Sequence, residues 1–389
     1  MVESVIDRAR CDTLLRAPAL GPNLLFFSGG TALRPLSRQL KRYTHNSIHL
    51  ITPFDSGGSS AEIRRAFNML AVGDLRNRLL ALADESVQAN SAIYRLFSYR
   101  LPQQCSEQQL LSELLQLASA SHEKMTALPD SIRKTVRQSL AHFASLLPRD
   151  FNLRGANIGN LLITSAYLSH DCDIAAALWY FSQMLLVRGV VAPSCDADAH
   201  LAAVLRNGTR LIGQHRITGR EVAPIDAPIE ELFITRRLSS QEAVSVSATS
   251  RALSLICSAD LICYSYGSFY SSVVANLLPQ GIGRAVASVS CPKIYVPNWG
   301  KDPEQLGMTL ADTVERLIHA VRTDAPDAAV RDVVRTVLID SKNLKYALPL
   351  DVERCAALGI QIVDLPFATK NADGEIDFTP LAETLLSLS

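Results

Sequence analysis

The sequence has no excess of charge of either sign. Its 389 residues include 38 lysine and arginine residues and 38 aspartate and glutamate residues. A chain without net charge creates no overall field that would attract nucleic acid or an anionic membrane. We therefore expect neither of these as a partner, and a site for an anionic ligand must be formed by a local group of residues.

Paired cysteines and signals for export are also lacking. The eight cysteines are scattered, without a C-x-x-C pair, and His45 and His49 have zinc-like spacing but no evident third ligand. The first residues lack the apolar core of a secretory signal. The longest apolar stretch, 174–192, is interrupted by Gln183 and Arg188 and is typical of a buried helix followed by a strand. These features favour the reducing cytoplasm.

Common catalytic and cofactor motifs are absent as well. The sequence contains no G-x-S-x-G elbow, no G-x-G-x-x-G turn and no P-loop lysine, and Cys291 before Pro292 has no identifiable base. We therefore expect neither a hydrolase with a nucleophilic triad nor a protein with a redox cofactor.

What the sequence does have is an alternation of short apolar runs and amphipathic helical segments. This alternation predicts an α/β fold of the Rossmann-like, doubly wound type, with a mainly parallel sheet and right-handed crossovers. Between about 85 and 150 only helical patterns occur, including a capping box at Ser106 and Gln109. We expect a single domain, 1–389, with a helical insertion at about 85–150. The expected strands are 24–27, 48–51, 185–191, 232–235, 261–264, 294–296, 337–339 and 360–363, with a hairpin turning at Asn207-Gly208.

Glycine-rich turns follow the first two expected strands. In a doubly wound sheet, ligands bind beyond the carboxyl ends of the strands, and glycines let an anion approach main-chain N–H groups. These turns are therefore candidate phosphate sites, although the alternatives are a structural turn and a solvated loop capped by Ser59 or Ser60. The candidate residues are Gly29, Gly30 and Thr31 in the first turn, and Asp55, Ser56, Gly57, Gly58, Ser59, Ser60 and the following Arg64 in the second.

Four later segments carry similar polar groups. We expect them to contribute to the same anion site, with Asp74 also capping a helix; an ordinary capped helix is the alternative for the first segment. The residues are Asp74, Arg76 and Asn77 after Gly73, then Gly159 and Asn160, then Gly267, Ser268 and Tyr270, whose main chain could form a further anion cradle, and finally Asn298.

Taken in order, these turns resemble the superfamily of 2-phospho-L-lactate transferase (CofD) and its relatives, the YvcK-type gluconeogenesis factors. The resemblance extends from about Leu24 to at least Thr309. The block from Asp55 through Gly73-Asp74-Leu75-Arg76-Asn77 resembles the YvcK branch more than the transferase branch, both in its residue types and in their spacing. Gly159-Asn160-Leu161-Leu162, Gly267-Ser268-Phe269-Tyr270 with Asn276-Leu277-Leu278, and Tyr295-Val296-Pro297-Asn298 resemble the later family motifs.

The resemblance implies a Rossmann-like sheet with a helical insertion, often in a homodimer. One branch transfers a phospho-lactyl-type group from a guanosine diphosphate-linked donor, with magnesium. The other branch binds uridine diphosphate sugars and acts in the control of carbon metabolism and envelope growth, without established catalysis. A degenerate enzyme that serves as a scaffold is a third alternative.

Three positions depart from the family pattern. Ser56 stands where the relatives have a second adjacent aspartate, which weakens a magnesium site at Asp55. Arg76 stands near an acidic position of the transferase branch, and a cation suits phosphate better than metal. Ala32 replaces a third glycine. Our hypothesis is a protein that binds a nucleoside diphosphate-linked ligand of the GDP or UDP type and transfers a phospho-lactyl-type group, with Asp55 and Asp74 as catalytic residues. The non-catalytic regulator and the scaffold are the alternatives.

Overall fold

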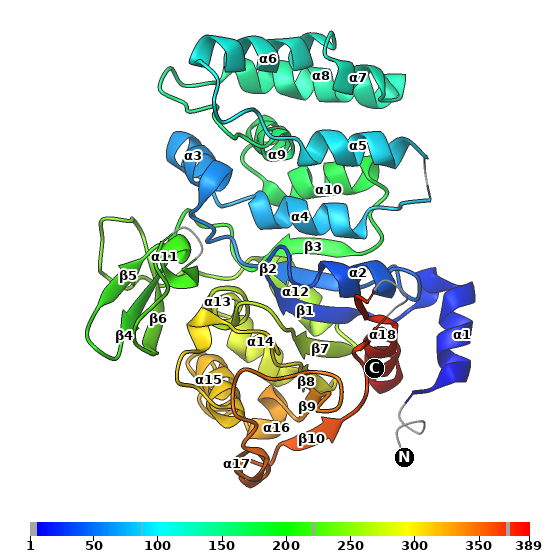
Figure 1. The fold of residues 1–389 in the computed structure, drawn as a ribbon, viewed down its shortest axis with the longest axis vertical. Helices are drawn as coiled ribbons and strands as arrows, with labels where there is room; N and C mark the ends of the chain where they lie inside the picture. The colour runs from blue at the N-terminus through cyan, green and yellow to red at the C-terminus, as the bar shows by residue number, and fades with distance from the viewer. Residues whose placement is uncertain (1–5, 87, 220–221, 371–373) are drawn as a thin grey trace. The chain divides into compact units, whose positions relative to one another are not determined.

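The computed structural model describes residues 6–86, 88–219, 222–370 and 374–389. Contacts between residues divide the chain into two compact units, which we describe separately (Figure 1). The sheet unit comprises Met1–Phe54 and Arg188–Ser389, and the helical unit comprises Asp55–Val187. The helices expected at about 85–150 lie within this helical unit, which also contains helices before and after them.

A seven-stranded parallel sheet forms the centre of the sheet unit. Its order is β10-β9-β8-β7-β1-β2-β3, and every neighbouring pair is parallel. The strand order reverses between β1 and β7, which is where doubly wound sheets bind ligands. The predicted α/β class is confirmed. The strands are β1 (Leu24–Ser28), β2 (Ile48–Ile51), β3 (Val190–Pro193), β7 (Leu261–Tyr264), β8 (Lys293–Tyr295), β9 (Thr336–Ile339) and β10 (Gln361–Asp364).

Both faces of this sheet are covered by an apolar core. Successive side chains of each strand point to opposite faces, so each strand contributes to both cores. In β1, Leu25 and Phe27 join one apolar core, and Leu24 and Phe26 join the other. The first core is completed by α12 (Ser250–Cys257), α14 (Ile282–Ser288), α15 (Leu310–Arg322), α16 (Val330–Val333) and α17 (Val352–Ala357). The second is completed by α1 (Arg8–Arg16), α2 (Arg34–Leu40) and α18 (Thr379–Leu388).

Smaller elements complete the sheet unit. An antiparallel sheet is formed by β4 (His200–Leu205), β5 (Arg210–Ile212) and β6 (Ile229–Thr235), next to which lies the short helix α11 (Gln214–Thr218). The predicted hairpin turn is confirmed, and the Asn207 side chain accepts a hydrogen bond from the N–H of Thr209. Two residue pairs join β11 (Thr369–Lys370) to β12 (Ile376–Asp377). After β7 the chain forms a π-helical segment, Phe269–Val274, that continues into α13 (Ala275–Leu277).

The helical unit is organised around a buried helix, α9 (Ile158–Ser169). Figure 1 shows α6 and α8 side by side, and the predicted capping box of Ser106 and Gln109 starts α6. Among the described residues of either unit, no helix is long and apolar enough to cross a membrane. The remaining helices of this unit are α3 (Gly58–Phe67), α4 (Gly73–Leu82), α5 (Gln88–Ser98), α6 (Glu107–Ser119), α7 (Glu123–Thr126), α8 (Asp130–Ser145) and α10 (Ile174–Met184).

Three local predictions were wrong. The strand expected at 185–191 begins only at Val190, because Leu185 still caps α10 and Leu186 has a left-handed backbone with φ of 49°. The cap expected at Ser59 or Ser60 is Gly57, so that both serines lie inside α3. Asp74 likewise lies in the first turn of α4 and not at its cap.

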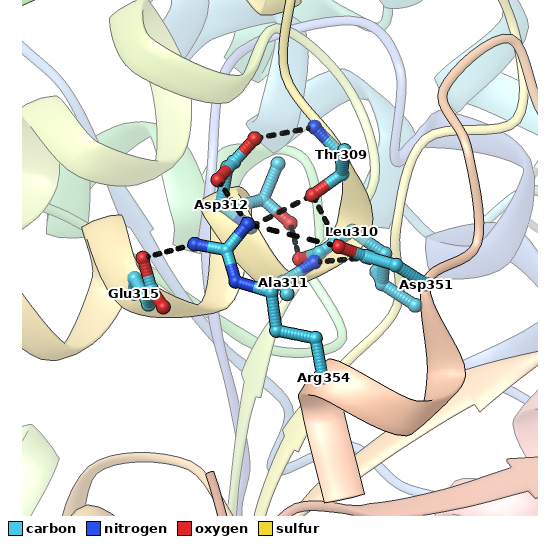
Figure 2. Close-up of polar contacts among 8 residues, drawn as sticks. Thr309, Leu310, Ala311, Asp312, Glu315, Asp351 and Arg354 are labelled. Atoms are coloured by element: carbon cyan, nitrogen blue, oxygen red, sulfur yellow. Dashed lines mark hydrogen bonds and ion pairs between the residues drawn. The ribbon is translucent and has the colours of Figure 1, made fainter. Parts of the chain in front are cut away.

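The start of α15 is held by a polar network that also involves α17 (Figure 2). The Asp351 carboxylate accepts hydrogen bonds from the N–H of Ala311 at 2.8 Å and from the hydroxyl of Thr309 at 2.6 Å. Arg354 binds Asp312 and Glu315, each at 2.7 Å. Because the first N–H groups of a helix have no partner within the helix, this carboxylate stabilises α15 and fixes α17 beside it.

We predict that Asp351→Ala lowers the free energy of unfolding by about 1–2 kcal/mol, because a helix start and the partly buried hydroxyl of Thr309 lose their acceptor. Urea unfolding followed by circular dichroism measures the change. Glu353→Ala, at an exposed position of the same helix, is the control and should change stability by less than about 0.5 kcal/mol. Equal effects of the two substitutions would contradict the role of Asp351.

Candidate functional site

The residues that the sequence assigns to one ligand site are divided between the two units. Gly29, Gly30, Thr31, Gly267, Ser268, Tyr270 and Asn298 belong to the sheet unit. Asp55, Ser56, Gly57, Gly58, Ser59, Ser60, Arg64, Asp74, Arg76, Asn77, Gly159 and Asn160 belong to the helical unit. Each group forms its own set of contacts.

In the sheet unit, three predicted turns meet where the strand order reverses. A Cβ atom on Gly267, whose φ is +129°, would lie 3.0 Å from the Cβ of Ala32, so the turns after β1 and β7 touch. The Asn298 side chain, which follows β8, donates to the carbonyl of Gly267 at 3.3 Å. The Ser265 hydroxyl donates to the Phe27 carbonyl of β1. Three of the turns that the sequence assigns to the site are therefore in contact at this edge.

Asn276 ties the same edge together, and site prediction from the sequence missed it. Its fully buried side-chain nitrogen donates to the carbonyls of Ser28 in β1 and Leu50 in β2, each at 3.2 Å. The amide oxygen of Asn276 has no hydrogen-bond partner among the described residues. Its place in the Asn276-Leu277-Leu278 motif was the signal available in the sequence.

Two of the N–H groups expected to face an anion after β7 are instead bound by carboxylates of the chain itself. Asp302 accepts from the N–H of Phe269 at 2.8 Å. Glu304 accepts from both the N–H and the hydroxyl of Ser271, at 2.8 and 2.6 Å. Two of the main-chain N–H groups that we expected to bind an anion at Gly267–Ser271 therefore already donate to carboxylates of the same chain. This corrects the prediction for these two N–H groups.

The Tyr270 phenol is buried in this region. It donates to the carbonyl of Ile229 at 3.3 Å, and the guanidinium of Arg316 lies 5.6 Å from the centre of its ring. Burial raises the pKa of Tyr270, and Arg316 partly offsets this effect. The tyrosine is therefore neutral and packs toward α15 and β6.

In the helical unit, a polar cluster forms where α4 begins. A Cβ atom on Gly73 would lie 2.6 Å from the Ser60 hydroxyl and 3.2 Å from a carboxylate oxygen of Asp55. Only glycine lets both groups approach the start of α4 so closely. The other carboxylate oxygen of Asp55 accepts from the N–H of Gly57 at 3.1 Å.

Ser59 and Asn160 extend this cluster toward α9. The Ser59 hydroxyl accepts from the N–H of Asn157 at 3.1 Å and from the side chain of Asn160 at 3.4 Å. Asn157 itself caps α9 by accepting from the N–H of Asn160. Asn160 is buried, and its amide oxygen has no hydrogen-bond partner within the described part of the chain.

Arg76 contributes a buried cation. Its side chain is 6% exposed, and one terminal nitrogen, Nη2, donates to the side-chain oxygen of Asn77 at 2.5 Å. The other two nitrogens, Nε and Nη1, are buried and find no hydrogen-bond partner among the residues described. Gly159 makes room for this side chain, because a Cβ there would lie 2.7 Å from the Cδ of Arg76.

Neighbouring charges act on the Arg76 guanidinium. Burial lowers its pKa to about 10, and repulsion from Arg100 adds to this effect. Asp74 and Asp55 oppose the shift by attraction. At neutral pH Arg76 is still a cation, so the helical unit holds a desolvated positive charge with two unused donors.

Arg64, which the sequence assigns to the anion site, is bound to main-chain carbonyls of its own unit. It is buried and donates to the carbonyls of Asp55 at 3.2 Å and Met69 at 3.3 Å. These bonds hold the Asp55 loop in place at the start of α3. Arg65, by contrast, is exposed and pairs with Glu62 and Asp150.

The cluster does not fit a metal ion held by the protein alone. Among the described residues, no three His, Cys, Asp or Glu side chains are grouped so that they could hold a metal. Asp55 is followed by Ser56, and a hydroxyl is a poor substitute for the anionic oxygens that magnesium prefers. Asp55 as a metal ligand stays a prediction.

Comparisons with known proteins identify the family of this chain. The sequence pattern of the family described as 2-phospho-L-lactate transferase CofD matches residues 24–368. The chain belongs to the CofD family. This match covers the strands of the parallel sheet and all the predicted site residues.

Relatives within the family point to the YvcK branch. A protein of Nostoc sp. is 28% identical over 380 residues, which are 94% of this chain and 68% of its own length. The gluconeogenesis factor of Bacillus subtilis is 25% identical over 88% of this chain and 90% of its own. A crystal structure from Bacillus halodurans, of a protein of the UPF0052 family, has the same fold, with a TM-score of 0.68, 23% identity, and 94% and 99% coverage of the two chains.

The carboxylates beside the Gly267 turn give this CofD-family chain a pH-dependent stability. Burial, followed by repulsion from Asp302, raises the pKa of Glu304 to about 7 from an ordinary value of 4.5. Between these two values the folded chain binds more protons than the unfolded chain, so the free energy of unfolding falls as the pH rises. We predict that protonated Glu304 stabilises the folded chain at acidic pH and that this contribution is lost as the pH rises toward neutrality.

Urea unfolding of the wild type and of Glu304→Gln across this pH interval isolates the effect. The free energy of unfolding of the wild type should fall relative to the variant as the pH rises, because the glutamine cannot ionise. If the free energies of unfolding of the wild type and of Glu304→Gln change with pH in parallel, the pKa of Glu304 is not raised in the folded chain.

Proposed function

We propose that this chain binds a nucleoside diphosphate-linked ligand and that Arg76 binds its phosphates. The observation that carries the proposal is the buried guanidinium whose Nε and Nη1 have no partner among the described residues. A buried donor without an acceptor costs about 1–3 kcal/mol, and more when it is charged. Phosphate oxygens accept hydrogen bonds from two guanidinium nitrogens at once, which removes this cost.

The start of α3 supplies further donors in the same unit. This ten-residue helix begins after Gly57, and no side chain among the described residues caps it. Gly58 has φ of +46°, and a Cβ there would meet nothing within 4 Å, so the main chain is accessible. A helix start with accessible N–H groups favours an anion. In our proposal the N–H groups of Gly58 and Ser59 share the phosphates with Arg76, while the N–H of Gly57 donates to Asp55.

Of the two functions that such binding could serve, we favour a regulator that responds to a nucleotide sugar. Ser56 replaces a carboxylate, and Arg76 places a cation beside Asp55 and Asp74, which suits phosphate binding without a metal. The name gluconeogenesis factor, given to relatives that match most of this chain, supports a role in carbon metabolism.

Transfer of a phospho-lactyl-type group is the second candidate. It is supported by the description of the family and by the two carboxylates, Asp55 and Asp74, that the chain retains. In this reaction Asp55 would accept the proton of the attacking hydroxyl while a nucleoside phosphate leaves, and Asp74 would orient the acceptor. Positioning and charge stabilisation would supply most of the rate enhancement.

Calorimetric titration with UDP-glucose and with GDP, each with magnesium and with a chelator, tests the proposal. We predict saturable binding that Arg76→Met weakens at least about tenfold, because two charge-assisted hydrogen bonds are lost. Binding of UDP-glucose in the presence of the chelator supports the regulator, and GDP binding that requires magnesium supports transfer.

The control is Arg137→Met, at an exposed position of α8 in the same unit, which should leave the affinity unchanged. Circular dichroism verifies that both variants are folded. Absence of binding by the wild type, or equal affinities of the wild type and Arg76→Met, would contradict the proposal.

A further inference from the structure

A second group of cationic side chains lines a cavity within the sheet unit. The cavity has a volume of about 350 Å³ and lies between α15 and the ends of β4 and β6. Its charged or ionisable lining residues are Arg206, Tyr270, Asp312, Glu315, Arg316 and His319. Apart from Tyr270, none of them belongs to the residues that the family motifs or the proposed function assign to a ligand.

One wall of the cavity is a single face of α15. Asp312, Glu315, Arg316 and His319 occupy positions i, i+3, i+4 and i+7 of the helix, which lie on one face. The opposite wall comes from the hairpin of the antiparallel sheet, where Arg206 directly follows β4 and its N–H donates to the carbonyl of Pro228. The phenol of Tyr270 is buried beside them.

The negative charges of this lining are already paired. Asp312 and Glu315 each bind the Arg354 guanidinium at 2.7 Å, as Figure 2 shows for this end of α15. In contrast, neither Arg206 nor Arg316 has a carboxylate within ion-pair distance among the residues that the structure describes. Arg206 and Arg316 are therefore the charged groups of this lining that are left without an ion-pair partner.

Arg316 is held in a fixed orientation. One of its terminal nitrogens donates to the carbonyl of Glu230 at 3.0 Å, and its guanidinium carbon lies 5.6 Å from the centre of the Tyr270 ring. A guanidinium has five N–H donors in a planar fork, so a group anchored through one of them still has donors for a ligand. Because the Arg316 side chain is already held in place, it loses little conformational entropy when an anion binds.

We propose that this cavity binds the phosphate group of a small organic phosphate, held between Arg206 and Arg316. A phosphate has three terminal oxygens and up to two negative charges, so it can accept from two guanidinium groups at once. The cavity volume is at the lower end of the range of about 300–1,000 Å³ that small-molecule sites occupy, so the ligand is smaller than a nucleotide. His319, which also lines the cavity, is available to contact the rest of the ligand.

Titration of the full chain with glycerol 3-phosphate, followed by calorimetry, tests this site. We expect saturable binding that Arg206→Ala and Arg316→Gln each weaken at least about tenfold. Glu315→Gln should strengthen binding, because it removes a negative charge from the lining. Arg210→Ala is the matched control, since this arginine lies in the same hairpin but does not line the cavity, and it should leave the affinity unchanged.

Two further measurements separate the alternatives. Glycerate, which carries a carboxylate in place of the phosphate, should bind at least about tenfold more weakly than glycerol 3-phosphate, and equal affinities would overturn the choice of phosphate. Arg76→Met should bind glycerol 3-phosphate like the wild type. The experiment therefore tests this proposal separately from the proposed nucleotide site. No saturable binding by the wild type, or an unchanged affinity in Arg206→Ala, would overturn the proposal.

Discussion

The buried guanidinium of Arg76 is the feature on which the account of this protein depends. A cation that is almost fully removed from water, with two donors that no described residue satisfies, destabilises the folded chain by itself. Two glycines near Arg76 allow the polar side chains of this cluster to pack closely. Gly159 leaves space for the side chain of Arg76, and Gly73 lets Asp55 and Ser60 approach the start of α4. The chain thus maintains an unsatisfied positive site, which a phosphate would complete.

In the sheet unit, two main-chain N–H groups of the predicted site have partners within the chain. There the N–H groups after β7 are satisfied by Asp302 and Glu304, at the cost of keeping a carboxylate fully buried. This cost explains why the pKa of Glu304 is raised. The N–H groups of Phe269 and Ser271 are thus bonded within the sheet unit, whereas no side chain among the described residues caps the start of α3.

Much of the fold could be predicted because strands buried on both faces appear as uninterrupted apolar runs, as in 24–27 and 261–264. The strand expected at 185–191 failed because the left-handed turn at Leu186 leaves no trace in the apolar pattern. In the site, the glycine turns were visible in the sequence. The partners of Ser271 and Arg76 were not, since Glu304 and Gly159 are distant in the chain and only tertiary packing brings them close.

The stability of Arg76→Met without any ligand tests the central claim most directly. Methionine fills a similar volume without a buried charge or unsatisfied donors. The account predicts that urea unfolding of this variant, in the absence of nucleotides and phosphate, shows a free energy of unfolding at least about 1 kcal/mol higher than that of the wild type. A free energy lower than that of the wild type would mean that the fold itself requires Arg76, and would contradict the view that this arginine is kept for a ligand.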